Sequence, residues 1–227
     1  PDGDGWTNME EYNGGSDPSA ADAVPPIGML RPHPRLWMEA GSGDPVVADM
    51  ATIIARAGQP AYATTWAAVQ GSGNVANQGL TYLVNGNAGS LANVKTALSS
   101  TTANADQLIY RSLAFDWVYS GLTPAERTTY AANLVTSGNS VIDANTYLYG
   151  NYGIRYQAAA AMAAIAAAGD ADVSVLWPKA YNRMVDVMQI TGDGAAPGDM
   201  EGRGAYGGGW PEGYDYSRHT QIHMLQY

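Results

Sequence analysis

The stretch LAFDWVYSGLTPAER, residues 113–127, predicts two helices joined by a tight turn. Its TPAE segment, residues 123–126, combines an N-cap Thr, a Pro suited to the first helical position and the Glu of a capping box. The helix that starts there is expected to run to about Asn145, and the preceding one to cover Asn104–Ser120. This segment therefore indicates an antiparallel helical hairpin.

Capping residues, prolines and glycines predict further helices on both sides of this hairpin, and strand-like alternation is scarce. The chain is therefore expected to be mainly α. The expected elements are a helix that Asp44-Pro45 starts and Gly58 ends, a second helix from Pro60 to Gly71, a short turn of helix at Gln78–Val84, and helices at Ser90–Leu98, Ile154–Ala168 and Asp172–Ile190, the last with a possible kink at Pro178.

Composition excludes several classes of function. The 227 residues contain 11 Lys and Arg against 21 Asp and Glu, a net charge of −10, and no basic run, so no nucleic acid is expected as a partner. Without cysteine there is no disulfide, thiolate metal site or thiol nucleophile. The longest apolar stretch, Ala158–Ala168, is too short to cross a bilayer, so no membrane span is expected.

The first residues, DGDGWTNMEE at 2–11, fit the later part of a calcium-binding loop. The metal ligands would be Asp2, Asp4, the Trp6 carbonyl, Asn8 and Glu11; the first ligand position would precede Pro1. This segment resembles the calcium-binding repeats of dockerin and thrombospondin type 3, which implies bound calcium and a secreted or cell-surface, bacterial-type protein. An acidic turn that only caps a helix is the alternative.

Three stretches in order resemble the heparinase II/III-like and alginate-lyase-type polysaccharide lyases: RPHPRLW at 31–37, the 113–127 hairpin, and residues 151–170 with the later GWPEGYDY at 209–216. The resemblance implies an incomplete α/α toroid of antiparallel helical hairpins. We expect a partial calcium loop and helix at 1–13, a linker at 14–32 and the N-terminal portion of the toroid at 33–227. Because the chain begins inside a motif and stops at Tyr227, we expect a truncated product whose toroid is completed by C-terminal domains or a further chain.

The resemblance also implies β-elimination beside a uronate in an acidic polysaccharide. Position in the motifs makes Tyr216 the candidate base and acid, with Asn151 neutralising the substrate carboxylate. His219 is the next candidate for a proton role, and Glu212 would orient these groups. The expected substrate-binding residues are Arg155, Tyr206, Trp210, Tyr214 and Arg218.

Several alternatives remain open at this point. Asn151 could simply cap its helix, Tyr216 could be a packing residue, and His219 with His223 could bind a metal. A glycoside hydrolase would pair Glu212 with Asp215 or Glu201, and a structural or glycan-binding protein would retain the fold without chemistry. The expected role of Asp116 and Trp117 is structural, holding a helix end or an inter-helix hydrogen bond.

Overall fold

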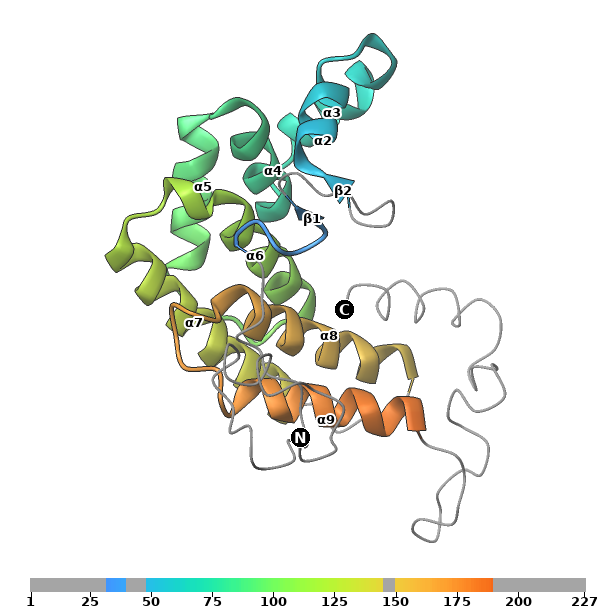
Figure 1. Cartoon of the computed structure of the whole chain (residues 1–227), viewed down its shortest axis with the longest axis vertical. Helices are drawn as coiled ribbons and strands as arrows, with labels where there is room; N and C mark the ends of the chain where they lie inside the picture. Colours follow the sequence, from blue (N-terminus) through green and yellow to red (C-terminus); the bar gives the residue numbers. More distant parts are fainter. Residues whose placement is uncertain (1–31, 40–47, 145–149, 190–227) are drawn as a thin grey trace, which may run out of the picture.

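The computed structural model describes residues 32–39, 48–144 and 150–189, and these are mainly helical (Figure 1). A two-residue parallel pairing of β1 with β2 precedes the helices. The elements are β1 (Met38–Glu39), β2 (Ala48–Asp49), α2 (Met50–Ala57), η2 (Pro60–Tyr62), α3 (Ala63–Gln70), α4 (Val75–Asn85), α5 (Ala88–Leu98), α6 (Ala105–Val118), η3 (Tyr119–Gly121), α7 (Pro124–Ala144), α8 (Gly150–Ala167) and α9 (Leu176–Gln189).

Local capping signals explain where many of these helices begin. The backbone N–H of Thr123 donates to the Glu126 carboxylate at 2.8 Å, and the Glu126 N–H donates to the Thr123 hydroxyl at 3.3 Å. This reciprocal pair confirms the predicted capping box at the start of α7. Asparagine side chains accept backbone N–H groups at the starts of three further helices, α4, α5 and α6.

Four sequence predictions about helix boundaries are wrong. Helix α8 begins at Gly150 rather than Ile154, and α9 begins at Leu176 rather than Asp172. The first helix of the pair α2–α3 begins at Met50 and is capped by Asp49, not by Asp44, because Asp49 accepts the Thr52 N–H. The short turn expected at Gln78–Val84 is a complete helix, α4, in which Asn74 supplies the N-cap and Gly86 the left-handed C-terminal residue. Pro178 lies in the first turn of α9, where a missing N–H removes no helical hydrogen bond.

Helices α4 and α6 run in the same direction along one layer of the molecule. Gly79 in the middle of α4 lies against Ala114 of α6, and a Cβ at position 79 would come 2.9 Å from the Ala114 Cα atom. Farther along both helices, Tyr82 lies against Gly121, just beyond the end of α6. Because both contacts advance together, the two helices are parallel and packed closely through glycine.

Helix α8 continues this layer in the same direction. Arg155 near its start forms an ion pair with Asp106 at the start of α6, with 3.2 Å between nitrogen and oxygen. Tyr119, just past the end of α6, hydrogen-bonds to Asp170, just past the end of α8. The contacts therefore give one row of parallel helices in the order α4, α6, α8.

Helices α5, α7 and α9 form a second row beside the first. Lys95 of α5 pairs with Glu126 early in α7, and Asp143 at the end of α7 pairs with Lys179 of α9. Since each odd-numbered helix returns from an even-numbered neighbour through a short turn, the chain forms three consecutive hairpins, α4–α5, α6–α7 and α8–α9 (Figure 1). Each hairpin contacts the next through both of its helices.

The core lies between these rows and is built largely from small side chains. Along α8 the residues from Gln157 to Ala164 are all buried, and seven of the eight are alanine or methionine. Larger buried side chains come from the neighbouring helices, among them Leu108, Phe115, Leu134 and Ile142. An alanine-rich helix lets its neighbours approach closely on every side.

Candidate functional site

Asp116 is buried in α6 and contacts residues 33–36, which lie far from it in the chain. The Asp116 carboxylate accepts the backbone N–H of Arg35, at 2.9 and 3.0 Å, and that of Leu36, at 2.8 Å. It also accepts from His33 Nδ1 at 2.5 Å. The carboxylate is fully buried, so these donors stabilise a charge that burial alone would disfavour. Asp116 therefore has a structural role, as expected, but its partners belong to the non-helical residues 33–36 rather than to a helix end or a second helix.

The same segment reaches the next helix of the row through Arg35. Its Nη1 donates to the carbonyl oxygens of Ile165 and Ala168, at 3.4 and 3.3 Å, in the last turn of α8. A cation at a helix C-terminus is favourable because the last carbonyls lack helical partners. Burial lowers the pKa of Arg35, while Asp116 acts in the opposite direction. Residues 33–36 thus tie the ends of α6 and α8 together.

This anchoring holds the next residue, Trp37, in an unusual conformation. The Leu36 carbonyl accepts the indole N–H of Trp117 at 3.2 Å, so the backbone on the near side of Trp37 is fixed. Trp37 has a φ of 63°, in the left-handed region, and 46% of its surface is exposed. For a bulky residue this conformation carries strain, and strain of this kind gathers at functional sites.

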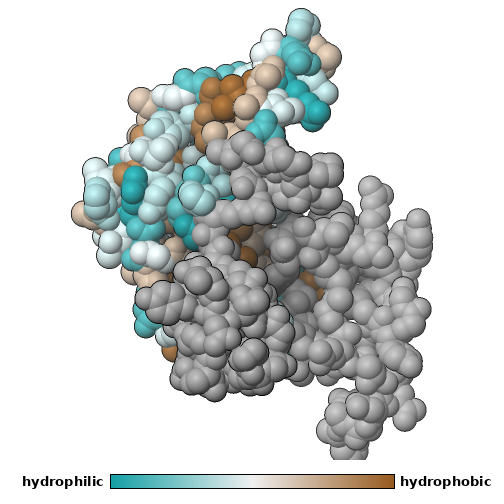
Figure 2. Space-filling model, viewed as in Figure 1, coloured by the Kyte–Doolittle hydropathy of each residue, from teal (hydrophilic) through white to brown (hydrophobic). Residues whose placement is uncertain are grey.

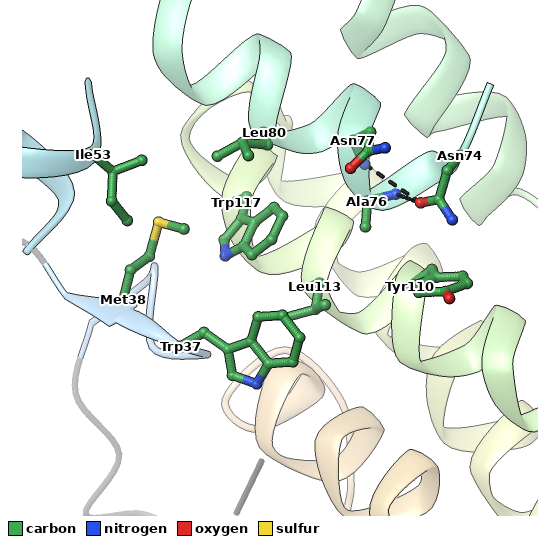
Figure 3. Close-up of a pocket in the computed structure, with 10 residues that line it drawn as sticks. All are labelled: Trp37, Met38, Ile53, Asn74, Ala76, Asn77, Leu80, Tyr110, Leu113 and Trp117. Carbon is green, nitrogen blue, oxygen red and sulfur yellow. Dashed lines mark hydrogen bonds between the residues drawn. The ribbon is translucent and has the colours of Figure 1, made fainter. Parts of the chain in front are cut away.

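Trp37 borders a pocket of about 510 Å³ between β1, α2, α4 and α6 (Figure 3). Its ring lies 6.5 Å from that of Trp117, centroid to centroid, at a tilt of 58°. Tyr110 is 40% exposed and lies on the α6 side of the opening. It shares one face of α6 with Leu113 and Trp117. The volume suits a small molecule or one to two sugar rings, and aromatic faces form much of the wall.

Two asparagines supply the polar edge of this pocket (Figure 3). Asn74 uses its side-chain carbonyl to accept the N–H groups of Ala76 and Asn77, which fixes its orientation and turns its amide nitrogen away from the helix. Both Asn74 and Asn77 are half-buried. All ten lining residues, which belong to the described part of the chain, are uncharged. The pocket is therefore equipped for hydrogen bonds to a neutral ligand.

A second cluster of polar and aromatic groups surrounds Tyr119 beside the anchor. The His33 ring stacks on the Tyr119 ring with 3.7 Å between centroids, and the Arg127 guanidinium lies 4.1 Å from the same ring. Burial and a hydrogen bond from its hydroxyl to Asp170 raise the pKa of Tyr119, against the smaller opposite effect of Arg127. A raised pKa keeps this phenol protonated, which suits a structural hydrogen bond better than a general base.

Two of the residues predicted for the catalytic site belong to described helix. Asn151 is the second residue of α8, of which the structure describes the backbone alone. Arg155 lies one turn later, and its Nη1 donates to Asp106 at 3.2 Å. The two therefore share the N-terminal end of α8, and because Asn151 lies inside the helix, the alternative in which it is the N-cap is wrong.

The remaining predicted site residues lie outside the described residues. This applies to the proposed catalytic group Glu212, Tyr216 and His219 and to the alternatives Glu201, Asp215 and His223. It also applies to four substrate-binding candidates, Tyr206, Trp210, Tyr214 and Arg218, and to the calcium ligands Asp2, Asp4, Trp6, Asn8 and Glu11. Their roles remain predictions from sequence.

The sequence reasoning did not identify the pocket itself. Trp37 was noted only as the end of a motif, and Asn74, Asn77 and Tyr110 were not singled out. A signal was present: Tyr110, Leu113 and Trp117 recur at three and four residues, and the two asparagines are three apart. That these two helical faces meet below Trp37 depends on long-range packing.

Comparison with protein-family models, with curated proteins and with solved structures gives no match for this chain. Across residues 32–39, 48–144 and 150–189, no group of three or more His, Asp or Glu side chains is placed to hold a metal ion. Within the same residues, every helix is too short or too polar to traverse a lipid bilayer.

Proposed function

We propose that this chain is the toroid portion of a polysaccharide lyase that cleaves a uronate-containing acidic polysaccharide by β-elimination. The proposal begins with the sequence resemblance and gains support from the architecture. Three consecutive hairpins with two rows of parallel helices are the arrangement that an incomplete α/α toroid requires. In such a fold the ends of one row would face a shared substrate groove.

The observation that carries the proposal is the contact between two of the resembling stretches. Residues 31–37 and 113–127 were matched separately, yet His33, Arg35 and Leu36 all bond to Asp116. Coincidental resemblances have no reason to meet around one buried carboxylate. The shared contact supports treating these two stretches as parts of one family pattern.

The chemistry expected of the site needs three groups. Asn151 would hydrogen-bond the uronate carboxylate, so that negative charge can develop on it as the α-proton leaves. Tyr216 would take that proton and return one to the departing glycosidic oxygen, with His219 and Glu212 orienting these groups. Trp210, Tyr214 and Tyr206 would contact sugar rings, while Arg218 would hold the carboxylate.

Arg155 would contribute to the same site at a position that Asp106 controls. Their ion pair is partly exposed, with 27% of the arginine side chain and 46% of the aspartate side chain accessible. A substrate carboxylate would therefore compete with Asp106 for the guanidinium or share it. Because the whole chain carries a net charge of −10, such local cations are what a polyanionic substrate would depend on.

The decisive experiment is to incubate the full chain with uronate polymers and follow the ultraviolet absorbance of unsaturated ends. Tyr216→Phe is expected to lower the rate by at least about 100-fold with folding intact. Tyr62→Phe is the matched control, because Tyr62 is 43% exposed in the α2–α3 region, and it should retain full activity. Reducing ends that form without this absorbance, and that Glu212→Gln abolishes, would replace the lyase with a hydrolase.

The extracellular setting and the calcium loop belong to the same proposal. Calcium would be held by Asp2, Asp4, Asn8, Glu11 and the Trp6 carbonyl, and the protein would be secreted or displayed at a cell surface. Titration calorimetry with calcium should show one site that Asp4→Asn weakens. The absence of calcium binding in the full chain would remove this part alone.

Glycan binding without chemistry is the second candidate, and the Trp37 pocket is the observation that favours it. An exposed aromatic ring next to amide groups can retain a sugar whether or not a proton-transfer site is present. Binding of oligosaccharides without any cleavage product would support this function in place of the lyase.

A further inference from the structure

We propose that the Trp37 pocket, formed by Trp37, Asn74, Asn77, Tyr110 and Trp117 with its aliphatic floor, binds an uncharged pyranose ring. The substrate class that follows rests on the proposed lyase activity: it is a polymer in which uncharged sugars adjoin the uronates. A homopolymer of uronates would then be a poor substrate.

The Trp37 ring is already positioned at the pocket before a ligand binds. The backbone just before Trp37 is fixed, because the Leu36 N–H donates to Asp116 and the Leu36 carbonyl accepts the Trp117 indole N–H. Trp37 itself has a left-handed φ, and its indole lies at the pocket (Figure 3). Nearly half of this large side chain is exposed, so it offers apolar surface that a ligand can bury. The apolar face of a pyranose ring would cover it, with little ordering of the protein on binding.

The amides of Asn74 and Asn77 form the polar edge of the pocket and lie across from its aromatic wall (Figure 3). Each amide nitrogen is a donor, and the Asn77 carbonyl is an acceptor. Sugar hydroxyls are both donors and acceptors, so they can satisfy these groups. A purely apolar ligand would leave the amides without partners and lose affinity for that reason.

The uncharged lining of the pocket disfavours a ligand that carries a carboxylate. A carboxylate placed in an uncharged pocket loses its hydration and gains no cation in return, which is strongly unfavourable. An uncharged sugar does not incur this cost.

The position of the pocket relative to the proposed catalytic end of α8 fits a polymer that crosses both. Asp106 pairs with Arg155, and Asp106 and Tyr110 are neighbours on α6. The Tyr110 side of the pocket therefore lies about one helical turn along α6 from the ion pair that Asp106 forms with Arg155 near the start of α8. A chain held at Tyr110 by an uncharged ring would present its neighbouring sugar toward Arg155.

The test measures binding and cleavage separately. Intrinsic tryptophan fluorescence and calorimetry of the full chain are recorded with neutral oligomers of N-acetylglucosamine and, in parallel, with oligogalacturonate. The expected result is binding of the neutral oligomer that is at least 10-fold tighter than that of the uronate oligomer.

Trp37→Gly is the informative variant, because glycine accepts a φ of 63° without strain while the ring is lost. Binding of the neutral oligomer should weaken at least 10-fold, with Tm kept within about 3 °C of the parent. Asn77→Leu, which keeps the approximate size without the amide, should weaken binding several-fold. The control Tyr62→Ala removes an aromatic side chain of similar exposure outside the pocket and should leave binding unchanged.

Equal or tighter binding of the oligouronate through Trp37 would overturn the proposal. So would the absence of saccharide binding, or neutral-sugar binding that persists in folded Trp37→Gly. Unsaturated products that still form in Trp37→Gly from a uronate homopolymer would refute the inferred substrate class while leaving the lyase intact. Sugar binding without any such product would refute the lyase while leaving the pocket intact.

Discussion

The α2–α3 hairpin and the six-helix body, α4 to α9, are both helical but are stabilised differently. In the body each helix contacts several others, and Leu108, Phe115 and Ile142 are fully buried. In the hairpin, every side chain of α2 and α3 is exposed or half-buried, and Figure 1 shows the pair extending away from the body. Figure 2 shows apolar surface beside it. Tyr62, Trp66 and Val69 line a shallow groove in this part of the chain.

This difference shows that a segment can form helices without contributing buried side chains to a core. Capping and amphipathic patterning suffice to define α2, whereas the body needs complementary surfaces from segments far apart in the chain. The hairpin is therefore expected to open locally at a lower free energy than the body. Three pairs of substitutions probe how the parts of the molecule are stabilised, from the largest expected effect to the smallest.

Removal of the Asp116 carboxylate should affect the body most. Asp116→Ala leaves the N–H groups of Arg35 and Leu36 buried without an acceptor, and it releases His33. We expect the free energy of unfolding to fall by about 3–5 kcal/mol, measured by urea denaturation. Asp143→Ala, which breaks the exposed pair with Lys179, should cost less than about 1 kcal/mol. Equal losses would show that residues 33–36 do not depend on Asp116.

Matched aliphatic truncations compare the two regions directly. Leu108→Ala removes a side chain that is 0% exposed in the body and should cost on the order of 3 kcal/mol. Ile54→Ala removes one that is 36% exposed on α2 and should change global stability by about 0.5 kcal/mol or less. Amide hydrogen exchange should in parallel be faster in α2–α3 than in α6. A large global effect of Ile54→Ala would show that the hairpin folds as one unit with the body.

The smallest effect is expected at the surface link between α5 and α7. The hydrogen bond from Lys95, then that from the Thr123 backbone, lowers the pKa of Glu126 from 4.5 to about 2. A depressed folded-state pKa means that this stabilisation is present above about pH 4.5 and is lost as pH falls toward 2. Glu126→Gln should therefore flatten the pH dependence of stability within that window.

The control for this last prediction is Asp172, whose pKa is also lowered, by its bonds to Ser174. Asp172→Asn should leave the contribution of the α5–α7 link unchanged, because Asp172 lies in the turn before α9. A Glu126→Gln profile identical to that of the parent protein between pH 2 and 4.5 would contradict the assignment.

Local sequence signals were sufficient for much of the fold. The TPAE capping box and most of the alanine-rich α8 could be recognised, because each depends on residues within one or two helical turns. The error at α4 has a physical source as well. Its glycine and asparagines disfavour a helix in isolation, but Gly79 allows α4 to pack against Ala114.

The candidate site was less accessible to the same reasoning. The sequence alone determined that the chain is acidic, free of cysteine and mainly helical, since these follow from composition and short-range periodicity. Only the tertiary structure decided that His33, Arg35 and Leu36 converge on Asp116, and that Trp37 faces Tyr110 and two asparagines. The reason is that such contacts join residues some 40 to 80 positions apart, and the direction in which parallel helices pack is set by the whole core rather than by any local segment.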